Sequence, residues 1–151
     1  MDGRLWGVVV DSFDKLLIPG LTVTIPLTLI SFVVGLALAI AVALVRVAKV
    51  PVIQRIAQFY VWVFRGTPLL VQLFVIFFGL PSVGIVFPAF PSAIIAFSLN
   101  VGAYASETLR GAILAVPKGQ IEAGLTTNLN YLTIMRLIVL PQAFRSAFPA
   151  L

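Results

Sequence analysis

Residues 16–45 read LLIPGLTVTIPLTLISFVVGLALAIAVALV, a run without a single charged side chain. A helix that crosses the hydrocarbon core of a bilayer needs about 20 predominantly apolar residues. The run meets that requirement, and it exceeds the ~7–15 apolar residues of a cleaved signal peptide. It therefore predicts a membrane-spanning helix over about residues 21–45, with an interfacial lead-in before it.

The composition of the whole chain points to the same class. Of 151 residues, 61% are hydrophobic and only 10% are charged, whereas soluble domains average about 45–50% apolar and about 25% charged residues. The sequence has no Cys and no His, which excludes disulfides, thiolate nucleophiles and imidazole chemistry and removes the ligands of most zinc sites. We therefore expect no metal site and no cofactor.

The basic charge balance favours membrane topology over nucleic-acid binding. The formal net charge is +5, but the Lys and Arg residues flank apolar runs, and no stretch interleaves aromatic with basic residues as a nucleic-acid surface does. We expect a lipid bilayer and no nucleic acid as the surroundings of this chain.

A second uncharged run fills residues 66–106. It is too long for one spanning helix, and its middle carries turn-forming residues, with GLPSVG at 79–84 followed by Pro88 and Pro91. We therefore expect two spans here, at about 59–80 and 91–116. The predicted fold class is all-α, a polytopic transmembrane helical bundle with about three spans.

The distribution of Lys and Arg predicts the orientation, because cytoplasmic segments carry an excess of both. Two of these residues precede the first span, four lie in residues 46–65, none lies in the turn near residue 80, and four lie in residues 110–145. The pattern predicts an N-terminus outside the cell and a cytoplasmic segment after residue 116.

Residues 117–141 form a less hydrophobic segment with helix punctuation. Pro117 suits the start of a helix, and an apolar stripe follows at Ile121, Leu125, Leu129 and Leu132. Asn128 readily adopts the left-handed conformation of a turn. A second helix over about 131–140 should stop at Pro141. The segment thus predicts a helix–turn–helix on the cytoplasmic face, or alternatively a plain amphipathic interfacial hairpin.

Four ordered motifs carry a family resemblance. Residues 65–72 read RGTPLLVQ, residues 102–111 read GAYASETLRG, residues 119–124 read GQIEAG, and residues 140–145 read LPQAFR. Together they resemble the permease subunits of polar amino-acid ABC importers (histidine, glutamine, glutamate and arginine permeases), whose cytoplasmic "EAA" loop the last two motifs match. That family usually has Ala where Gly124 stands and Gly where Asn128 stands, and it continues through about two more spans, which are absent here.

The resemblance implies a function and a set of partners. The chain would be the permease subunit of an ATP-driven importer in a bacterial inner membrane, forming the path for a polar amino acid. Its partners would be a cytosolic ABC ATPase, a second permease subunit and a periplasmic solute-binding protein. ATP hydrolysis would belong to the ATPase, and this sequence contains no Gly-x-x-x-x-Gly-Lys-Ser/Thr phosphate loop, so we expect a non-catalytic subunit.

The resemblance also assigns residues. The ATPase-coupling loop would use Gly119, Gln120, Glu122, Ala123, Gly124, Asn128 and Pro141. The second- and third-span motifs place structural residues at Arg65, Gly66, Thr67, Pro68 and Arg110.

Polar residues inside the predicted spans are candidates for the substrate pathway. They are Gln72, Asn100, Tyr104 and Glu107. The last three, with Arg110, recur at helical spacing and share one face. That face could line the route, or Glu107 could form a structural ion pair with Arg110 or Arg65; we favour the ion pair for Glu107 and the pathway for Asn100 and Tyr104.

Two other functional hypotheses remain at the level of sequence. An ATPase-independent transporter or channel would call for more intramembrane charge or a broken inverted repeat, and neither is visible. A non-transporting fragment is the other hypothesis, because three spans alone do not readily enclose a path.

Overall fold

The computed structural model describes residues 3–48 and 50–151. Lys49, one of the basic residues counted for the orientation, lies outside them. Every regular element of the described chain is helical, which confirms the predicted all-α class. In chain order the elements are α1 Gly3–Pro19, η1 Gly20–Thr24, α2 Ile25–Ala48, α3 Pro51–Gly66, α4 Leu69–Phe74, η2 Val75–Gly79, α5 Leu80–Ser82, α6 Ala89–Ala115, α7 Lys118–Thr126, α8 Tyr131–Ile134, η3 Met135–Val139, α9 Leu140–Ala147 and η4 Phe148–Ala150.

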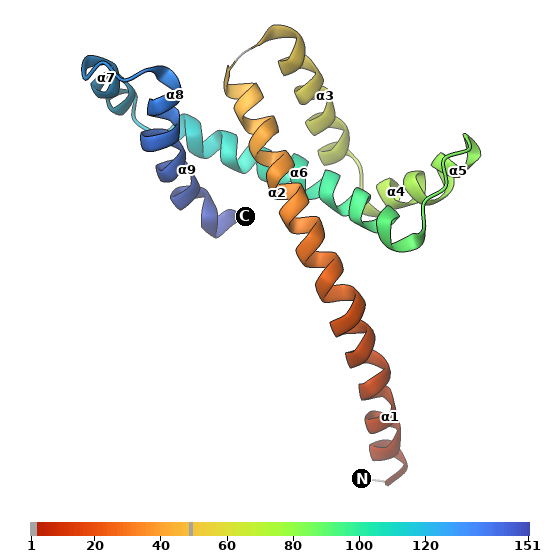
Figure 1. The fold of residues 1–151 in the computed structure, drawn as a ribbon. Coiled ribbons are helices and arrows are strands. Elements are labelled where there is room, and N and C mark those ends of the chain that lie inside the picture. Colours follow the sequence, from red (N-terminus) through yellow and green to blue (C-terminus); the bar gives the residue numbers. More distant parts are fainter. Residues whose placement is uncertain (1–2, 49) are drawn as a thin grey trace.

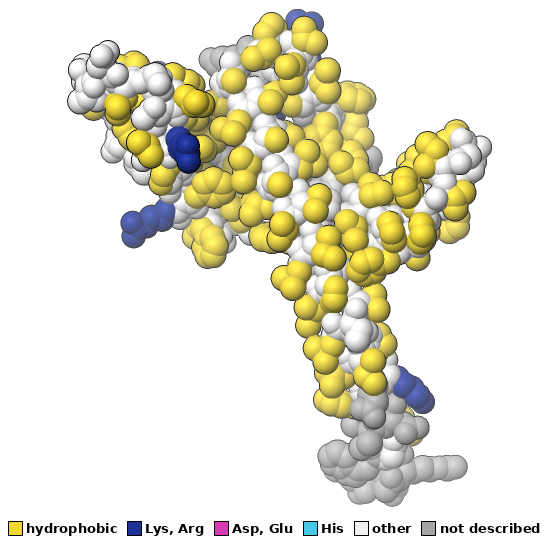
Figure 2. Space-filling model, viewed as in Figure 1, with side chains coloured by type: hydrophobic (Ala, Val, Ile, Leu, Met, Phe, Trp, Pro, Cys, Tyr) yellow, Lys and Arg dark blue, Asp and Glu magenta, His cyan; other side chains and the backbone are white. Residues whose placement is uncertain are grey.

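A long N-terminal arm dominates the shape of the molecule. Helix α1, the turn η1 and the start of α2 project as one rod away from the other helices (Figure 1). The apolar side chains of this rod are largely exposed, among them Leu16 at 75% and Val33 at 64%. Hydrophobic side chains also cover most of the face shown in Figure 2, with Lys and Arg at its margins. Such a surface suits hydrocarbon rather than water.

Two helices are long and apolar enough to cross a bilayer. They cover Lys15–Ala48 and Ala89–Ala115, and their most hydrophobic windows have mean hydropathies of 2.7 and 1.2. They correspond to the first and third spans expected from the sequence. A third crossing is available if α3 and the helix after it count as one broken span.

The core forms where α2 crosses α6 (Figure 1). Gly35 of α2 receives Val101, because a Cβ on Gly35 would lie 2.8 Å from the Val101 Cβ. Gly102 of α6 receives Leu38 in the same way, at 2.8 Å from its Cδ2. Small residues therefore let the two backbones approach closely, and Ala39 between them is fully buried.

The second expected span is not one straight helix. Helix α3 ends at Gly66 and α4 begins at Leu69, and the two axes meet at 108°. Thr67 between them is extended, with φ −120° and ψ 141°, because a residue that precedes proline disfavours the helical conformation. The expectation of a continuous helix over 59–80 therefore missed the break that Pro68 imposes.

Other prolines leave the helix running. Pro26, Pro81 and Pro141 each stand two residues after a π-helical turn, namely η1, η2 and η3. Proline lacks an N–H and its ring collides with the carbonyl four residues before it, and a widened turn relieves that collision. The prediction that a helix stops at Pro141 is therefore wrong: the chain stays helical through η3 and α9 to Ala147.

Candidate functional site

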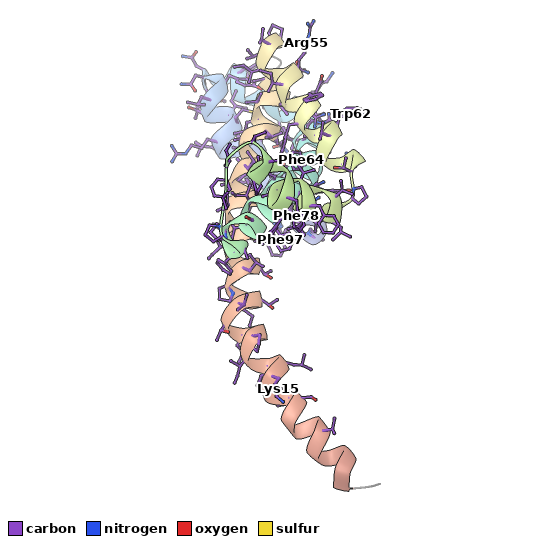
Figure 3. All side chains as sticks on the ribbon, turned by 90° about the vertical axis from the view of Figure 1, so that its right-hand side faces the viewer. Lys15, Arg55, Trp62, Phe64, Phe78 and Phe97 are labelled. Atoms are coloured by element: carbon purple, nitrogen blue, oxygen red, sulfur yellow. The ribbon has the colours of Figure 1, made fainter. Side chains whose placement is uncertain are left out.

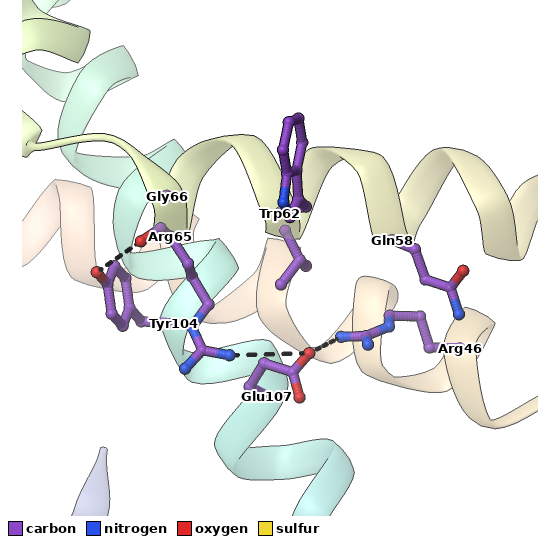
Figure 4. Close-up of a pocket in the computed structure, with 8 residues that line it drawn as sticks. Arg46, Gln58, Trp62, Arg65, Gly66, Tyr104 and Glu107 are labelled. Carbon is purple, nitrogen blue, oxygen red and sulfur yellow. Dashed lines mark hydrogen bonds and ion pairs between the residues drawn. The ribbon is translucent and has the colours of Figure 1, made fainter.

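A polar cleft of roughly 460 Å³ opens between α2, α3 and α6 (Figure 4). Each helix contributes part of the wall, and two arginines and one glutamate face into it. The lining residues are Arg46, Gln58, Val61, Trp62, Arg65, Gly66, Tyr104 and Glu107. It is the place where predicted pathway residues of the third span meet charged residues from other helices.

Glu107 forms ion pairs with three arginines. Its Oε1 accepts a hydrogen bond from Arg46 Nη1 and lies 4.0 Å from Arg65 Nη1. Its Oε2 accepts from Arg110 Nε at 3.2 Å and from Arg110 Nη2 at 3.1 Å. The side chain of Arg46 is only 11% exposed. The geometry therefore agrees with the ion-pair interpretation of Glu107 and adds Arg46 from α2.

Arg46 is the functional residue that sequence reasoning missed. It lies 61 positions before Glu107, so no helical periodicity connects the two. Its only signal was its position as the first charge after the long apolar run. A buried cation at the end of a span needs a partner, and Glu107 is that partner.

Tyr104 packs beside Arg65 at the rim of the cleft. The Arg65 guanidinium carbon lies 5.4 Å from the centre of the Tyr104 ring, within cation–π range. The Tyr104 hydroxyl points to the Arg65 carbonyl at 3.5 Å, and the residue is 48% exposed. Tyr104 is therefore open to the cleft, whereas the Arg65 guanidinium lies between the Tyr104 ring and Glu107 and interacts with both.

Gln72 and Asn100 lie apart from this cleft and bind each other. Asn100 Nδ2 donates to Gln72 Oε1 at 3.1 Å. Gln72 Nε2 in turn lies 2.8 Å from the Phe64 carbonyl and 3.0 Å from the Thr67 carbonyl. These two carbonyls lie at the C-terminal end of α3, where no further helical turn supplies backbone N–H donors to them. Gln72, which is 7% exposed, therefore stabilises the α3–α4 break, and the four pathway candidates are not gathered in one cavity.

The motif around the break has a local structural role. Thr67 Oγ1 donates to the Val63 carbonyl at 2.8 Å and accepts from Gln72 Nε2 at 3.0 Å. Pro68 stands at the N-cap position of α4. Gly66 has open space around it, so its contribution is to end α3 rather than to admit a neighbour.

The second candidate site is the hairpin of α7 with α8, η3 and α9. A groove of roughly 480 Å³ runs between the two arms and is lined by Gly119, Gln120, Ala123, Gly124, Thr127 and Ile138. Gln142 Nε2 bridges the arms by donating to Gln120 Oε1 at 2.8 Å. Glu122 is exposed on the outside of α7. Four residues expected in the coupling loop therefore line one groove, and Glu122 stands free of it.

Gly124 faces inward. It is buried, and a Cβ there would lie 2.8 Å from Ile134 Cγ1 and 2.9 Å from Ile134 Cδ1. Ile134 is itself fully buried. The packing between the arms thus uses a glycine, whereas two members of the expected stripe, Leu125 and Leu132, are 53% and 77% exposed.

The turn of the hairpin uses Asn128, as predicted. Its φ of 61° is the only positive φ of a non-glycine residue in the described part of the chain. The N–H of Leu129 bonds the Gly124 carbonyl at 3.1 Å, and the N–H of Asn128 bonds the Leu125 carbonyl at 3.0 Å. This pair of bonds is the Schellman cap of a helix C-terminus. Asn130 then caps α8, its Oδ1 accepting from the Thr133 N–H at 2.8 Å.

Two permease proteins of Bacillus subtilis are similar to this chain in sequence. The chain is 50% identical over 146 residues to the L-cystine transport system permease protein TcyB of Bacillus subtilis (strain 168), covering 97% of this chain and 62% of that protein. It is 40% identical to the arginine transport system permease protein ArtQ of the same organism, over 89% of this chain and 62% of the relative.

The structural match is equally extensive. A crystal structure described as an amino acid ABC transporter with histidines superposes with a TM-score of 0.83 at 35% identity, over 95% of this chain and 67% of that one. Residues 32–151 match the family described as binding-protein-dependent transport system inner membrane component. Although it spans less than two thirds of the length of TcyB and ArtQ, this multi-pass membrane chain belongs to the binding-protein-dependent transport system inner membrane component family.

Proposed function

We propose that this chain forms the pathway-side subunit of an ATP-driven importer for a polar amino acid. The observation that carries the proposal is the match over nearly the whole chain to proteins whose names specify the transport of cystine, of arginine and, for a putative protein of Rickettsia bellii, of glutamine. The subunit itself would be non-catalytic, with ATP hydrolysis on a cytosolic ABC ATPase. A second permease subunit and a periplasmic solute-binding protein complete the proposed assembly.

The hairpin is the proposed contact with the ATPase. It is the part of the chain where a helix of nine residues, α7, stands outside the bundle with a free carboxylate, Glu122, on its outer face. The proposed orientation places this hairpin in the cytoplasm and the N-terminus outside, in a bacterial inner membrane. Lys and Arg counts on either side of the spans support that orientation.

Co-purification tests the proposal directly. The chain is extracted in a mild detergent from cells that also express a cytosolic ABC ATPase subunit of an amino-acid importer, and the ATPase that stays bound is quantified. We expect retention by the wild type and loss with Glu122→Lys, because the exposed carboxylate would be replaced by a repelling charge. Arg55→Glu, an equally exposed charge reversal on α3, should retain the ATPase.

Two outcomes would contradict the docking proposal. Absence of an ATPase from the wild-type preparation would favour an ATPase-independent transporter or a non-transporting chain. Equal loss with Glu122→Lys and Arg55→Glu would show a response to charge in general rather than to α7.

The proposed substrate pathway includes Tyr104, which is open to the charged cleft, and Asn100. Because Asn100 donates to Gln72, removing its amide also loosens the α3–α4 break. Uptake of labelled amino acid by Asn100→Ala and Tyr104→Ala must therefore be normalised to the amount of folded protein in the membrane. Wild-type uptake per folded molecule in either variant would remove that residue from the pathway.

A further inference from the structure

The charged cleft between α2, α3 and α6 carries more positive than negative charge. Arg46, Arg65 and Arg110 surround the single carboxylate of Glu107. Arg110 binds Glu107 from outside the cleft wall, so the wall itself holds two guanidinium charges, Arg46 and Arg65, against one carboxylate, a net of one positive charge. Uncompensated charges at the edge of a membrane are costly, so they gather where a counter-charge is available.

Among the side chains that the structure describes, Glu107 is the one carboxylate in the cleft wall. The sequence contains five acidic residues. Three of them precede Lys15, and α1 lies at the far end of the arm from α3 (Figure 1). The remaining one, Glu122, is exposed on α7 and is absent from the cleft wall. The described part of the cleft thus keeps a net positive charge that an external anion can balance.

Arg65 offers the accessible donor groups of the cleft. It makes a 4.0 Å ion pair with Glu107 through Nη1 and a cation–π contact with Tyr104, and 46% of its side chain stays exposed. The Arg46 side chain is 11% exposed and adds positive charge to the cleft wall. Arginine presents a planar fork of donors that matches the oxygens of a phosphate.

The position of the cleft specifies the source of the anion. Arg46 lies two residues from the end of the candidate span Lys15–Ala48, and Arg110 lies five residues from the end of Ala89–Ala115. The cleft is therefore at the level where a span meets the headgroups. Trp62, 72% exposed, projects from α3 beside it (Figure 3), as interfacial tryptophans do.

We propose that this cleft binds the phosphate of an anionic phospholipid headgroup, with Arg65 as the donor, the charge of Arg46 behind it, and the exposed ring of Trp62 against the acyl chains. Free inorganic phosphate has the same chemistry, and the experiment below separates the two sources. The inference does not depend on the proposed transport function, since lipid retention and ATPase retention are measured separately.

The test uses the full chain in nanodiscs of phosphatidylcholine alone or of phosphatidylcholine with phosphatidylglycerol. Bound phosphatidylglycerol is counted by native mass spectrometry, and the thermal unfolding midpoint is recorded in both discs. We expect the wild type to retain phosphatidylglycerol and to unfold at a higher temperature in its presence. Arg65→Gln should bind it about fivefold more weakly, the effect of one basic group near an anionic surface.

Two further variants make the result specific. Arg55→Gln removes an exposed arginine of the same helix outside the cleft (Figure 3) and should leave retention unchanged. Glu107→Gln removes the competing carboxylate and should increase retention, a change in the opposite direction that misfolding would not produce. Equal behaviour in both discs, equal losses with Arg55→Gln and Arg65→Gln, or the same stabilisation by inorganic phosphate in phosphatidylcholine discs would overturn the proposal.

Discussion

The α3–α4 break and the α7–α9 hairpin both redirect the chain, the first beside Pro68 and the second at Asn128, and different groups stabilise them. A side chain stabilises the break, because Gln72 donates to the carbonyls of Phe64 and Thr67. The hairpin is stabilised by the backbone hydrogen bonds of the turn at Asn128 and by the packing of Gly124 against Ile134. A proline thus ends a helix where a polar side chain satisfies the freed carbonyls, and it is absorbed where a π-turn precedes it.

The largest expected effect comes from Gln72→Leu. The substitution leaves two carbonyls and the Asn100 amide without their partner in a partly buried place, and each buried unsatisfied group costs about 1–3 kcal/mol. We expect a loss of about 3 kcal/mol in the free energy of unfolding, measured by circular dichroism during denaturation in bicelles. Gln58→Leu, at an exposed position of α3, is the control and should change stability by less than about 0.5 kcal/mol. Equal effects of both would mean that the amide does not hold the break.

Gly124→Ala tests the packing of the hairpin. Helix propensity alone predicts a gain of about 1 kcal/mol, whereas the collision with Ile134 predicts a loss of about 1–3 kcal/mol. Because Ile134 is fully buried, we expect the collision to prevail with a net loss of about 1 kcal/mol. The double variant with Ile134→Val should recover part of it. A stabilised Gly124→Ala protein would show that the arms can separate at no cost.

Asn128→Ala tests the cap. An alanine in the left-handed conformation costs about 1 kcal/mol, so we expect a loss of about that size. Asn128→Gly should be neutral or stabilising, because glycine adopts this conformation without a steric penalty. Hydrogen exchange of the Leu129 amide, bonded to the Gly124 carbonyl, reports the cap directly. Unchanged exchange in the alanine variant would contradict its dependence on Asn128.

Pro141→Ala should have the smallest effect. The helix already runs through this position, and the widened turn η3 relieves the steric clash that the proline ring would cause. We expect a stability change below about 0.5 kcal/mol and a more regular helix, visible as slower amide exchange in residues 137–142. A loss above about 2 kcal/mol would mean that the π-turn is itself required for packing.

The sequence predicted what depends on composition and on local conformation. Uncharged runs predicted an all-α membrane protein, and Asn128 predicted the turn. Whether a proline ends a helix or lies within it could not be predicted from the sequence, because that outcome depends on the groups packed around Pro68 and Pro141. Arg46 was missed because its partner lies on another helix, and the inward face of Gly124 was missed because only the position of Ile134 reveals it.

The crossing of α2 and α6 has a mechanical consequence. Val101 of α6 packs against Gly35 of α2, and Leu38 of α2 packs against Gly102 of α6. The side chains of the two helices therefore interdigitate. A shift of one helix by one residue, about 1.5 Å along its axis, would make the Val101 and Leu38 side chains collide with the facing backbone at the same time. We therefore expect the pair to tilt as one body. Shape changes in this chain should then concentrate at the kink at Thr67 and Pro68 and at the link of Val116 and Pro117 that carries the hairpin.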